Sequence, residues 1–193
     1  MKKQLFAFIL AIALVIAMVR CQTSDCTTVD SVSDLILKSY SSRTFTSEPV
    51  SAGNLEVILK CGIKAPSARN LQPWKFIVVE DISLMQQMIG NVTEGNVLIV
   101  ICGPEAQANT TVDFDCGLAT ENMTIAAQSL GLGARIYTGP IGNVNSAMKE
   151  ILQIPAGWRA IAILRVGHIE SNVDAASAAS PRNSYEEVVT FLR

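Results

Sequence analysis

The feature of this sequence that most constrains its fold is the unbroken apolar run from Val97 to Cys102. The run has the length of a single β-strand, is rich in β-branched residues, and shows no alternation between apolar and polar side chains. A strand of this kind is covered on both faces. The sequence therefore predicts a sheet with further layers of structure packed against each of its sides.

Weaker signals place the other elements around that strand. Strands are expected at Trp74–Val79 and Ala160–Val166, with a short extended segment at Ala134–Tyr137. Apolar residues at helical spacing predict helices at Val29–Lys38, from Pro49 to near Gly62, and at Asp81–Met88, Phe114–Leu130, Val144–Leu152 and Glu186–Leu192. Because strands and helices do not alternate strictly, the order favours an α+β sandwich.

The N-terminal segment has the pattern of a secretory signal. Lys2 and Lys3 precede an apolar run from Leu5 to Val19, which is shorter than the roughly 20 residues of a transmembrane helix. We therefore expect a leader at residues 1–20, a linker at 21–28 and one domain at 29–193, exported to a bacterial periplasm or cell envelope. An uncleaved membrane anchor and a lipid attached to Cys21 are the alternatives.

Composition argues against several classes of function. The chain of 193 residues has a net charge of -2 and only 6% aromatic residues, whereas nucleic-acid binding needs a basic face or stacking platforms. Five cysteines occur without a C-x-x-C pair, and His168 is the single histidine, so we expect no zinc site. Cys61 and Cys102 fit small buried apolar side chains, although disulfide pairing in an exported chain stays open.

No motif for catalysis by protein groups alone is found. The sequence contains no G-x-G-x-x-G, P-loop, H-E-x-x-H or G-x-S-x-G pattern. His168 is the sole imidazole, a Ser-His or Cys-His nucleophile pair lacks neighbouring support, and the residue fits a solvated position at a strand end. If the chain is an enzyme, a bound cofactor should supply the chemistry.

Three polar clusters on predicted turns could hold such a cofactor. They are Ser41 with Arg43, the run Pro66–Trp74, and Arg182. Arginines and a hydroxyl suit a phosphate dianion, because guanidinium groups bind its oxygens bidentately. A proline-bracketed loop with Asn70 could present fixed donors and acceptors to a flat heterocycle. Taken singly, each cluster also has a purely structural interpretation: the arginines could be solvated surface residues, and the Pro73-Trp74 pair could anchor the loop to the core.

The same clusters carry a resemblance to a known family. The runs Ser41–Phe45, Ala65–Phe76 and Leu130–Gly133 are similar, in order and spacing, to those of the nitroreductase family of FMN-dependent oxidoreductases. Weaker similarity at Ile154–Trp158 and Arg182–Val189 extends the match to nearly the whole of residues 30–193. The resemblance implies an α+β sandwich with a central, mainly antiparallel sheet. It also implies an intertwined homodimer with one FMN in each of two interface clefts.

The resemblance further implies roles for individual residues. In the family, the turn after the first helix and an arginine near the C-terminus hold the FMN phosphate. A P-S-x-x-N loop reaches the flavin ring from the partner subunit, and the segment after G-L-G lies beside the reactive nitrogen of the ring. The corresponding residues are Tyr40, Ser41, Arg43 and Arg182 for the phosphate, Pro66, Ser67 and Asn70 for the ring, and Thr138 and Gly139 beside the nitrogen.

One position departs from the family pattern. Many members carry Arg-Arg before the serine, where this chain has Ser39-Tyr40. Loss of a phosphate cation should weaken FMN binding, since a hydrogen bond to a charged group contributes about 1.5–3 kcal/mol. Lys38 could compensate for the missing arginine.

The activity implied by the resemblance is a flavin-dependent transfer of electrons. NADH or NADPH would supply the electrons, and a nitroaromatic, a quinone or a similar planar compound would accept them, with no side chain acting as a nucleophile. Two alternatives stay open. One is an exported module with a weakened or lost flavin site, and the other is an electron carrier served by a protein partner.

Overall fold

A computed structural model describes residues 31–105, 111–170 and 181–192 of the chain. The expected leader, the linker with Cys21 and Cys26, and the expected flexible stretch at 174–180 lie outside these residues. All four strands and the helices packed on them belong to one compact unit that begins at Leu35. Within the described ranges, no helix has the length and apolar character needed to cross a membrane.

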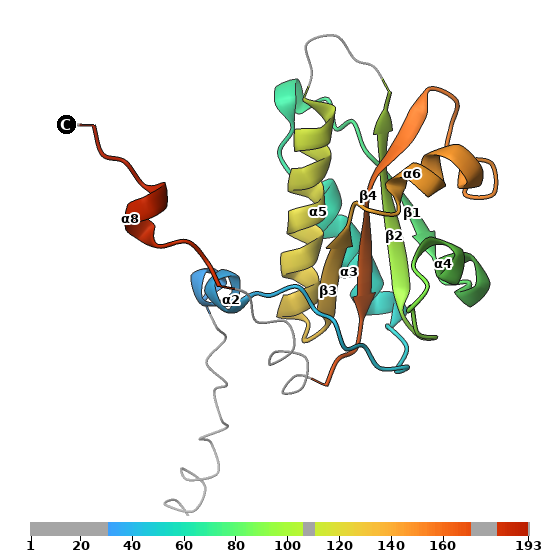
Figure 1. Cartoon of the computed structure of the whole chain (residues 1–193), viewed down its shortest axis with the longest axis horizontal. Helices are drawn as coiled ribbons and strands as arrows, with labels where there is room; N and C mark the ends of the chain where they lie inside the picture. The colour runs from blue at the N-terminus through green and yellow to red at the C-terminus, as the bar shows by residue number, and fades with distance from the viewer. Residues whose placement is uncertain (1–30, 106–110, 171–180, 193) are drawn as a thin grey trace, which may run out of the picture. The chain divides into compact units, whose positions relative to one another are not determined.

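The centre of that unit is a four-stranded sheet in the order β1-β2-β4-β3, shown in Figure 1. Its strands are β1 (Lys75–Val79), β2 (Val97–Pro104), β3 (Gly133–Tyr137) and β4 (Trp158–Gly167). Every neighbouring pair is antiparallel, which confirms the predicted sheet. β1 and β3 are the edge strands, and every residue of the central strand β2 is buried, as the apolar run predicted.

Helices cover both faces of the sheet (Figure 1). One face packs against α3 (Ala52–Ile63) and α5 (Val112–Ser129), and the other against α4 (Ile82–Met88), α6 (Ile141–Asn143) and η2 (Val144–Met148). Alternate residues of β2 serve the two layers: Ile99 and Ile101 face α5, and Leu98 and Val100 face α4 and η2. The period of two along a strand therefore divides the core into two parts.

Two of the helices begin at residues whose side chains cap them. The Ser51 hydroxyl accepts the N–H of Asn54 at the start of α3, and the Asp81 carboxylate accepts the N–H of Leu84 at the start of α4. Each side chain satisfies one of the backbone donors that a helix leaves unpaired in its first turn. The first described helix, α2, spans Val32–Lys38.

Two predicted helices have different bounds in the structure. The segment expected to be helical at Val144–Leu152 begins earlier, at Ile141, and includes the π-helical turn η2, which ends at Met148. The segment expected at Glu186–Leu192 is limited to α8 (Tyr185–Val188), which starts with a Ser184–Glu187 capping box and ends because Val189 is extended. Apolar spacing alone does not show where a backbone leaves the helical conformation.

The cysteines within the described part of the chain are free thiols. Cys102 and Cys116 are buried and Cys61 is half-buried, which agrees with the expectation that Cys102 is a small core side chain. Burial raises the pKa of Cys102 to about 11. Burial, with the nearby Asp113 and Asp115 carboxylates, raises the pKa of Cys116 to about 12. These thiols therefore stay protonated at neutral pH.

Candidate functional site

The first predicted cluster lies at the beginning of edge strand β3. The Ser42 N–H donates to the Ala134 carbonyl at 3.0 Å, and the Gln128 side-chain amide at the end of α5 donates to the Tyr40 carbonyl at 2.9 Å. A Cβ at Gly133 would lie only 2.8 Å from Ser42 Oγ, so glycine is needed for this close approach. These contacts hold the turn from Tyr40 to Arg43 in place, with Ser41 and Arg43 exposed.

A buried arginine lies beneath the segment that follows this turn. Arg165 on β4 is only 2% exposed; its Nε donates to Asn96 Oδ1 at 2.8 Å, and its guanidinium stacks 4.0 Å from the Phe45 ring. Burial is the main cause that lowers the pKa of Arg165. The sequence analysis did not single out Arg165, although a charged residue inside the apolar strand Ala160–Val166 was a usable signal.

Thr138 and Gly139 lie immediately beyond the other end of β3. Both are exposed, the Thr138 carbonyl accepts the N–H of Ile141 at 3.3 Å, and the space around Gly139 is open. From Ala134 to Thr138 the strand extends about 13 Å. The Tyr40–Arg43 turn and the Thr138–Gly139 segment therefore lie at the two ends of the same edge strand.

The loop that contains Pro66, Ser67 and Asn70 has an unusual backbone. Three non-glycine residues are in the left-handed region, with φ of 55° at Arg69, 57° at Asn70 and 48° at Gln72. The Ser67 hydroxyl accepts the Gln72 N–H at 3.0 Å and so closes the loop. Left-handed residues of this kind cost about 1–3 kcal/mol each and are concentrated at functional sites.

A buried carboxylate anchors this loop. Asp115 in the first turn of α5 is 1% exposed, and both of its oxygens lie 3.2 Å from the Ala68 nitrogen, whose N–H they accept. The adjacent Cys116 thiol lies 3.6 Å from the Pro73 carbonyl. Sequence reasoning missed Asp115, because nothing local distinguishes it from a carboxylate that stabilises a helix N-terminus.

A single chain does not bring the loop and the turn together. The Pro66–Asn70 loop is anchored at Asp115 and the Tyr40–Arg43 turn at Gln128, and these residues are separated by about 20 Å along one helix. Arg182 lies exposed shortly before the Ser184 cap of α8. The structure thus groups Tyr40, Ser41, Arg43, Thr138 and Gly139 along β3, and it places Pro66, Ser67 and Asn70 elsewhere.

Two buried polar atoms near β3 test whether the site fits a flavin nucleotide. Gln128 Oε1 and the Tyr137 hydroxyl have no hydrogen-bond partner among the described residues. Tyr137 lies near the Arg165 guanidinium, but without the geometry of a hydrogen bond. Buried polar groups normally have partners, and the ribityl hydroxyls and ring N–H of FMN are suitable ones. The residues present therefore fit FMN.

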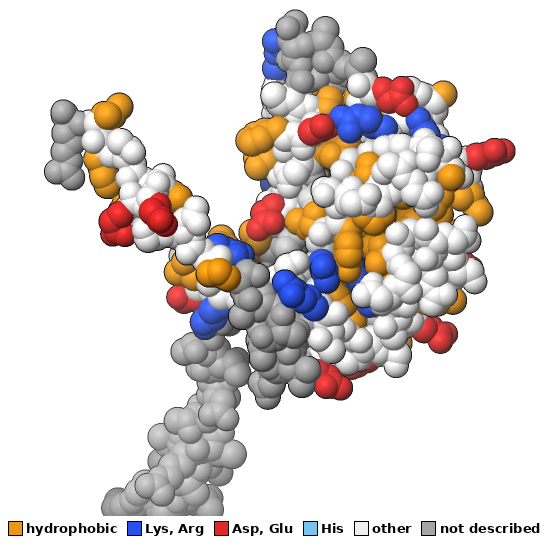
Figure 2. Space-filling view, in the orientation of Figure 1, with side chains coloured by type: hydrophobic (Ala, Val, Ile, Leu, Met, Phe, Trp, Pro, Cys, Tyr) orange, Lys and Arg blue, Asp and Glu red, His pale blue; other side chains and the backbone are white. Residues whose placement is uncertain are grey.

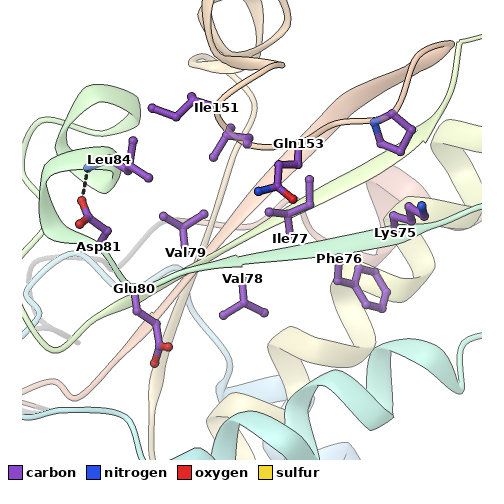
Figure 3. A pocket seen from close by; sticks show the side chains of 12 residues that line it. Lys75, Phe76, Ile77, Val78, Val79, Glu80, Asp81, Leu84, Ile151 and Gln153 are labelled. Atoms are coloured by element: carbon purple, nitrogen blue, oxygen red, sulfur yellow. Dashed lines mark hydrogen bonds between the residues drawn. The ribbon is translucent and has the colours of Figure 1, made fainter.

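A groove lies at the opposite edge of the sheet and contains none of these residues. It is an open groove of about 560 Å³ between β1, Asp81 and Leu84 at the start of α4, and the segment from Ile151 to Pro155. Figure 3 shows Ile77 and Val79 pointing into this groove, and Phe76 and Val78 pointing away from it.

The fold and the site together define a class of protein, an α+β domain with an exposed polar turn at one end of β3 and a strained polar loop near the start of α5. Comparison with known families gives the same answer. The sequence model of the nitroreductase family matches residues 36–97 and 90–168. The chain belongs to the nitroreductase family.

Individual relatives agree with this assignment. An Archaeoglobus fulgidus protein whose name gives NADH dehydrogenase or NAD(P)H nitroreductase is 32% identical over 72% of this chain and 86% of its own. An NADPH-flavin oxidoreductase of Vibrio harveyi is 26% identical over 80% of this chain and 75% of its own. A nitroreductase structure from Desulfovibrio desulfuricans in complex with FMN is 27% identical, with a TM-score of 0.72, and covers 85% of this chain and 98% of its own.

Proposed function

We propose that this protein is an FMN-dependent oxidoreductase that takes electrons from NADH or NADPH. The observation that carries the proposal is the placement of the Tyr40–Arg43 turn and the Thr138–Gly139 segment at the two ends of β3. Their separation of about 13 Å along the strand is suited to a phosphate at one end and a flavin ring at the other. The FMN complex of the Desulfovibrio desulfuricans relative supports the choice of cofactor.

Each group of residues has a separate task in this proposal. Ser41, Arg43, Arg182 and the Tyr40 backbone bind the phosphate, because guanidinium groups and a hydroxyl neutralise and hydrogen-bond its oxygens. FMN held by these residues would supply the redox chemistry, the transfer of electrons from the nicotinamide to a nitroaromatic, quinone or similar planar acceptor. Thr138 and Gly139 would lie beside the ring, where a backbone N–H could hydrogen-bond its reactive nitrogen.

The proposal requires a homodimer. The Pro66–Asn70 loop and the Tyr40–Arg43 turn are anchored at opposite ends of α5, and in this proposal Pro66, Ser67 and Asn70 contact the flavin held by a second copy. Large apolar side chains are exposed in the single chain, with exposed fractions of 83% at Leu37, 64% at Phe114 and 95% at Leu192. Apolar surface of this extent supports burial against another copy.

The location of the protein is part of the proposal. We propose that residues 1–20 act as an export signal or a lipoprotein-type leader, on the pattern of Lys2, Lys3 and the apolar run to Val19. N-terminal sequencing of the protein from membrane and periplasmic fractions tests this point. A cytoplasmic protein with an intact N-terminus would contradict it.

One observation favours a second candidate function. Ser39 stands where many family members have an arginine, so the chain could be an exported module whose flavin site is weakened or lost. Visible spectra separate the two candidates. Purified protein with a flavin band supports the oxidoreductase, and colourless protein that does not take up added FMN supports the module.

A second experiment identifies the electron donor. The FMN-loaded protein is mixed anaerobically with NADH or NADPH, and flavin absorbance is followed. Bleaching with either donor is expected. A flavin-containing protein that neither donor bleaches would be an electron carrier served by another donor, rather than an NAD(P)H oxidoreductase.

A further inference from the structure

Two arginines face each other across β3 and β4. Arg135 pairs directly with Arg165 in the antiparallel register, so both side chains leave the same face of the sheet. Like charges in directly opposed positions destabilise a sheet, and the positive charge of Arg135 contributes to lowering the pKa of the buried Arg165, after the larger effect of burial. Such a pair calls for a compensating anion.

No carboxylate in the described part of the chain provides that anion. The ion pairs formed there by Lys60, Lys149, Arg159 and His168 involve other cations than these two. Arg165 donates one hydrogen bond to Asn96 and stacks on the Phe45 ring. Arg135 only stacks over the Tyr137 ring, with 4.9 Å between its guanidinium carbon and the ring centre.

Arg135 is also more exposed to solvent than Arg165. It is partly exposed, and its N–H groups have no acceptor among the described residues. Figure 2 shows Lys and Arg side chains gathered over the region of β3. An anion at this surface could therefore reach the Arg135 guanidinium, with Arg165 adding positive potential from beneath.

The position of Arg135 relates it to the Tyr40–Arg43 turn. The residue before it, Ala134, accepts the Ser42 N–H, and the glycine two residues before it lies against the Ser42 side chain. Phe45, just after the turn, stacks on Arg165. The turn thus folds over the same face of the sheet from which Arg135 projects.

We propose that Arg135 is a further cation of the FMN phosphate site, beside Arg43 and Arg182, and compensates for the arginine that Ser39 replaces. The inference rests on the proposed function. A phosphate dianion matches the charge of the uncompensated arginine pair, and a guanidinium can bind two of its oxygens at once. The uncharged flavin ring cannot supply the compensating negative charge. Thr138, which the proposal puts beside the ring, is about 10 Å from Arg135 along the strand.

The test compares FMN with riboflavin, which has the same ring without the phosphate. Affinities are measured by flavin fluorescence titration for the wild-type protein and Arg135→Gln. We expect Arg135→Gln to weaken FMN binding about 10- to 100-fold while riboflavin binding stays unchanged. Arg135→Lys, which keeps the charge and loses the bidentate geometry, should recover part of the loss.

Two controls make the result specific. Lys149→Gln removes a partly exposed cation that pairs with Glu105 and should leave both affinities unchanged. Inorganic phosphate should compete with FMN for the wild-type protein and compete less well for Arg135→Gln. Because the substitution removes a repulsion with Arg165, the melting temperature of the apoprotein should not fall.

The outcomes separate the inference from the proposed function. If the wild-type protein binds FMN and Arg135→Gln binds it equally well, or loses FMN and riboflavin affinity to the same extent, the role of Arg135 is wrong and the oxidoreductase proposal stands. If the wild-type protein binds neither compound, both proposals fail.

Discussion

Asp115 holds the backbone of Ala68, with both carboxylate oxygens 3.2 Å from the same nitrogen. The two residues are 47 positions apart in the chain. The contact fixes a loop in which Arg69, Asn70 and Gln72 are left-handed. A buried acceptor therefore compensates for part of the cost of a backbone that would not form in isolation.

Removal of this carboxylate should damage both stability and cofactor binding. Asp115→Ala leaves the Ala68 N–H without a partner, which costs about 1–3 kcal/mol and releases the loop. Asp115→Asn retains an acceptor and should lose less. Urea unfolding and FMN titration of both variants check this, and equal stability of Asp115→Ala and the wild-type protein would show that Asp115 does not hold the loop.

Gly133 should not tolerate a side chain. A Cβ there would clash with Ile169 Cγ2 and lie 2.8 Å from Ser42 Oγ, so Gly133→Ala must displace the Tyr40–Arg43 turn or the segment that follows β4. We expect a loss of about 1–3 kcal/mol in unfolding free energy together with weaker FMN binding. Gly142→Ala, where the space around a Cβ is open, is the matched control and should be neutral for both measurements.

Asn145 should be needed for stability and not for the cofactor. Its side chain donates to the Ala160 carbonyl at 3.0 Å and accepts the Ala160 N–H at 2.8 Å, next to the register shift between β2 and β4. Asn145→Ala leaves both backbone groups unpaired and should cost about 1–3 kcal/mol. Thermal unfolding measures the loss, and a change in FMN affinity larger than that loss explains would contradict the separation of roles.

The buried thiols should react slowly. Burial raises the pKa of Cys102 to about 11 and of Cys116 to about 12, so their reactive thiolate forms appear only as pH approaches those values. At pH 8, alkylation of the native protein should label the half-buried Cys61 before Cys102 and Cys116, as peptide mass spectrometry can show. Rapid native labelling of Cys116 would mean that the Asp115 end of α5 opens readily.

Arg182 should affect the retention of the cofactor. If it binds the phosphate, Arg182→Ala loses a charge-assisted hydrogen bond and should release FMN at least about tenfold more readily on dialysis. Lys60→Ala, which removes a surface cation paired with Glu56 on α3, is the control. Unchanged retention in Arg182→Ala would exclude Arg182 from the site.

Much of the fold could be predicted from local patterns. The apolar run at Val97–Cys102 predicted a strand covered on both faces, and Asp81 marked the start of a helix, because periodicity and capping act over a few residues. The bounds of the helix predicted at Val144–Leu152 were less accurate, since the helical segment runs from Ile141 to Met148. The π turn at Val144–Met148 has no signature in apolar spacing.

The candidate site also has one part that the sequence predicted and another that only the tertiary structure shows. The sequence alone determined the family, through the runs Ser41–Phe45 and Ala65–Phe76, and with it the expected contacts of Arg43 and Asn70. Only the tertiary structure decided that Arg135 opposes Arg165 and that Asp115 holds Ala68. These relationships depend on strand register and helix packing between residues far apart in the chain, where no local periodicity reports which side chains will meet.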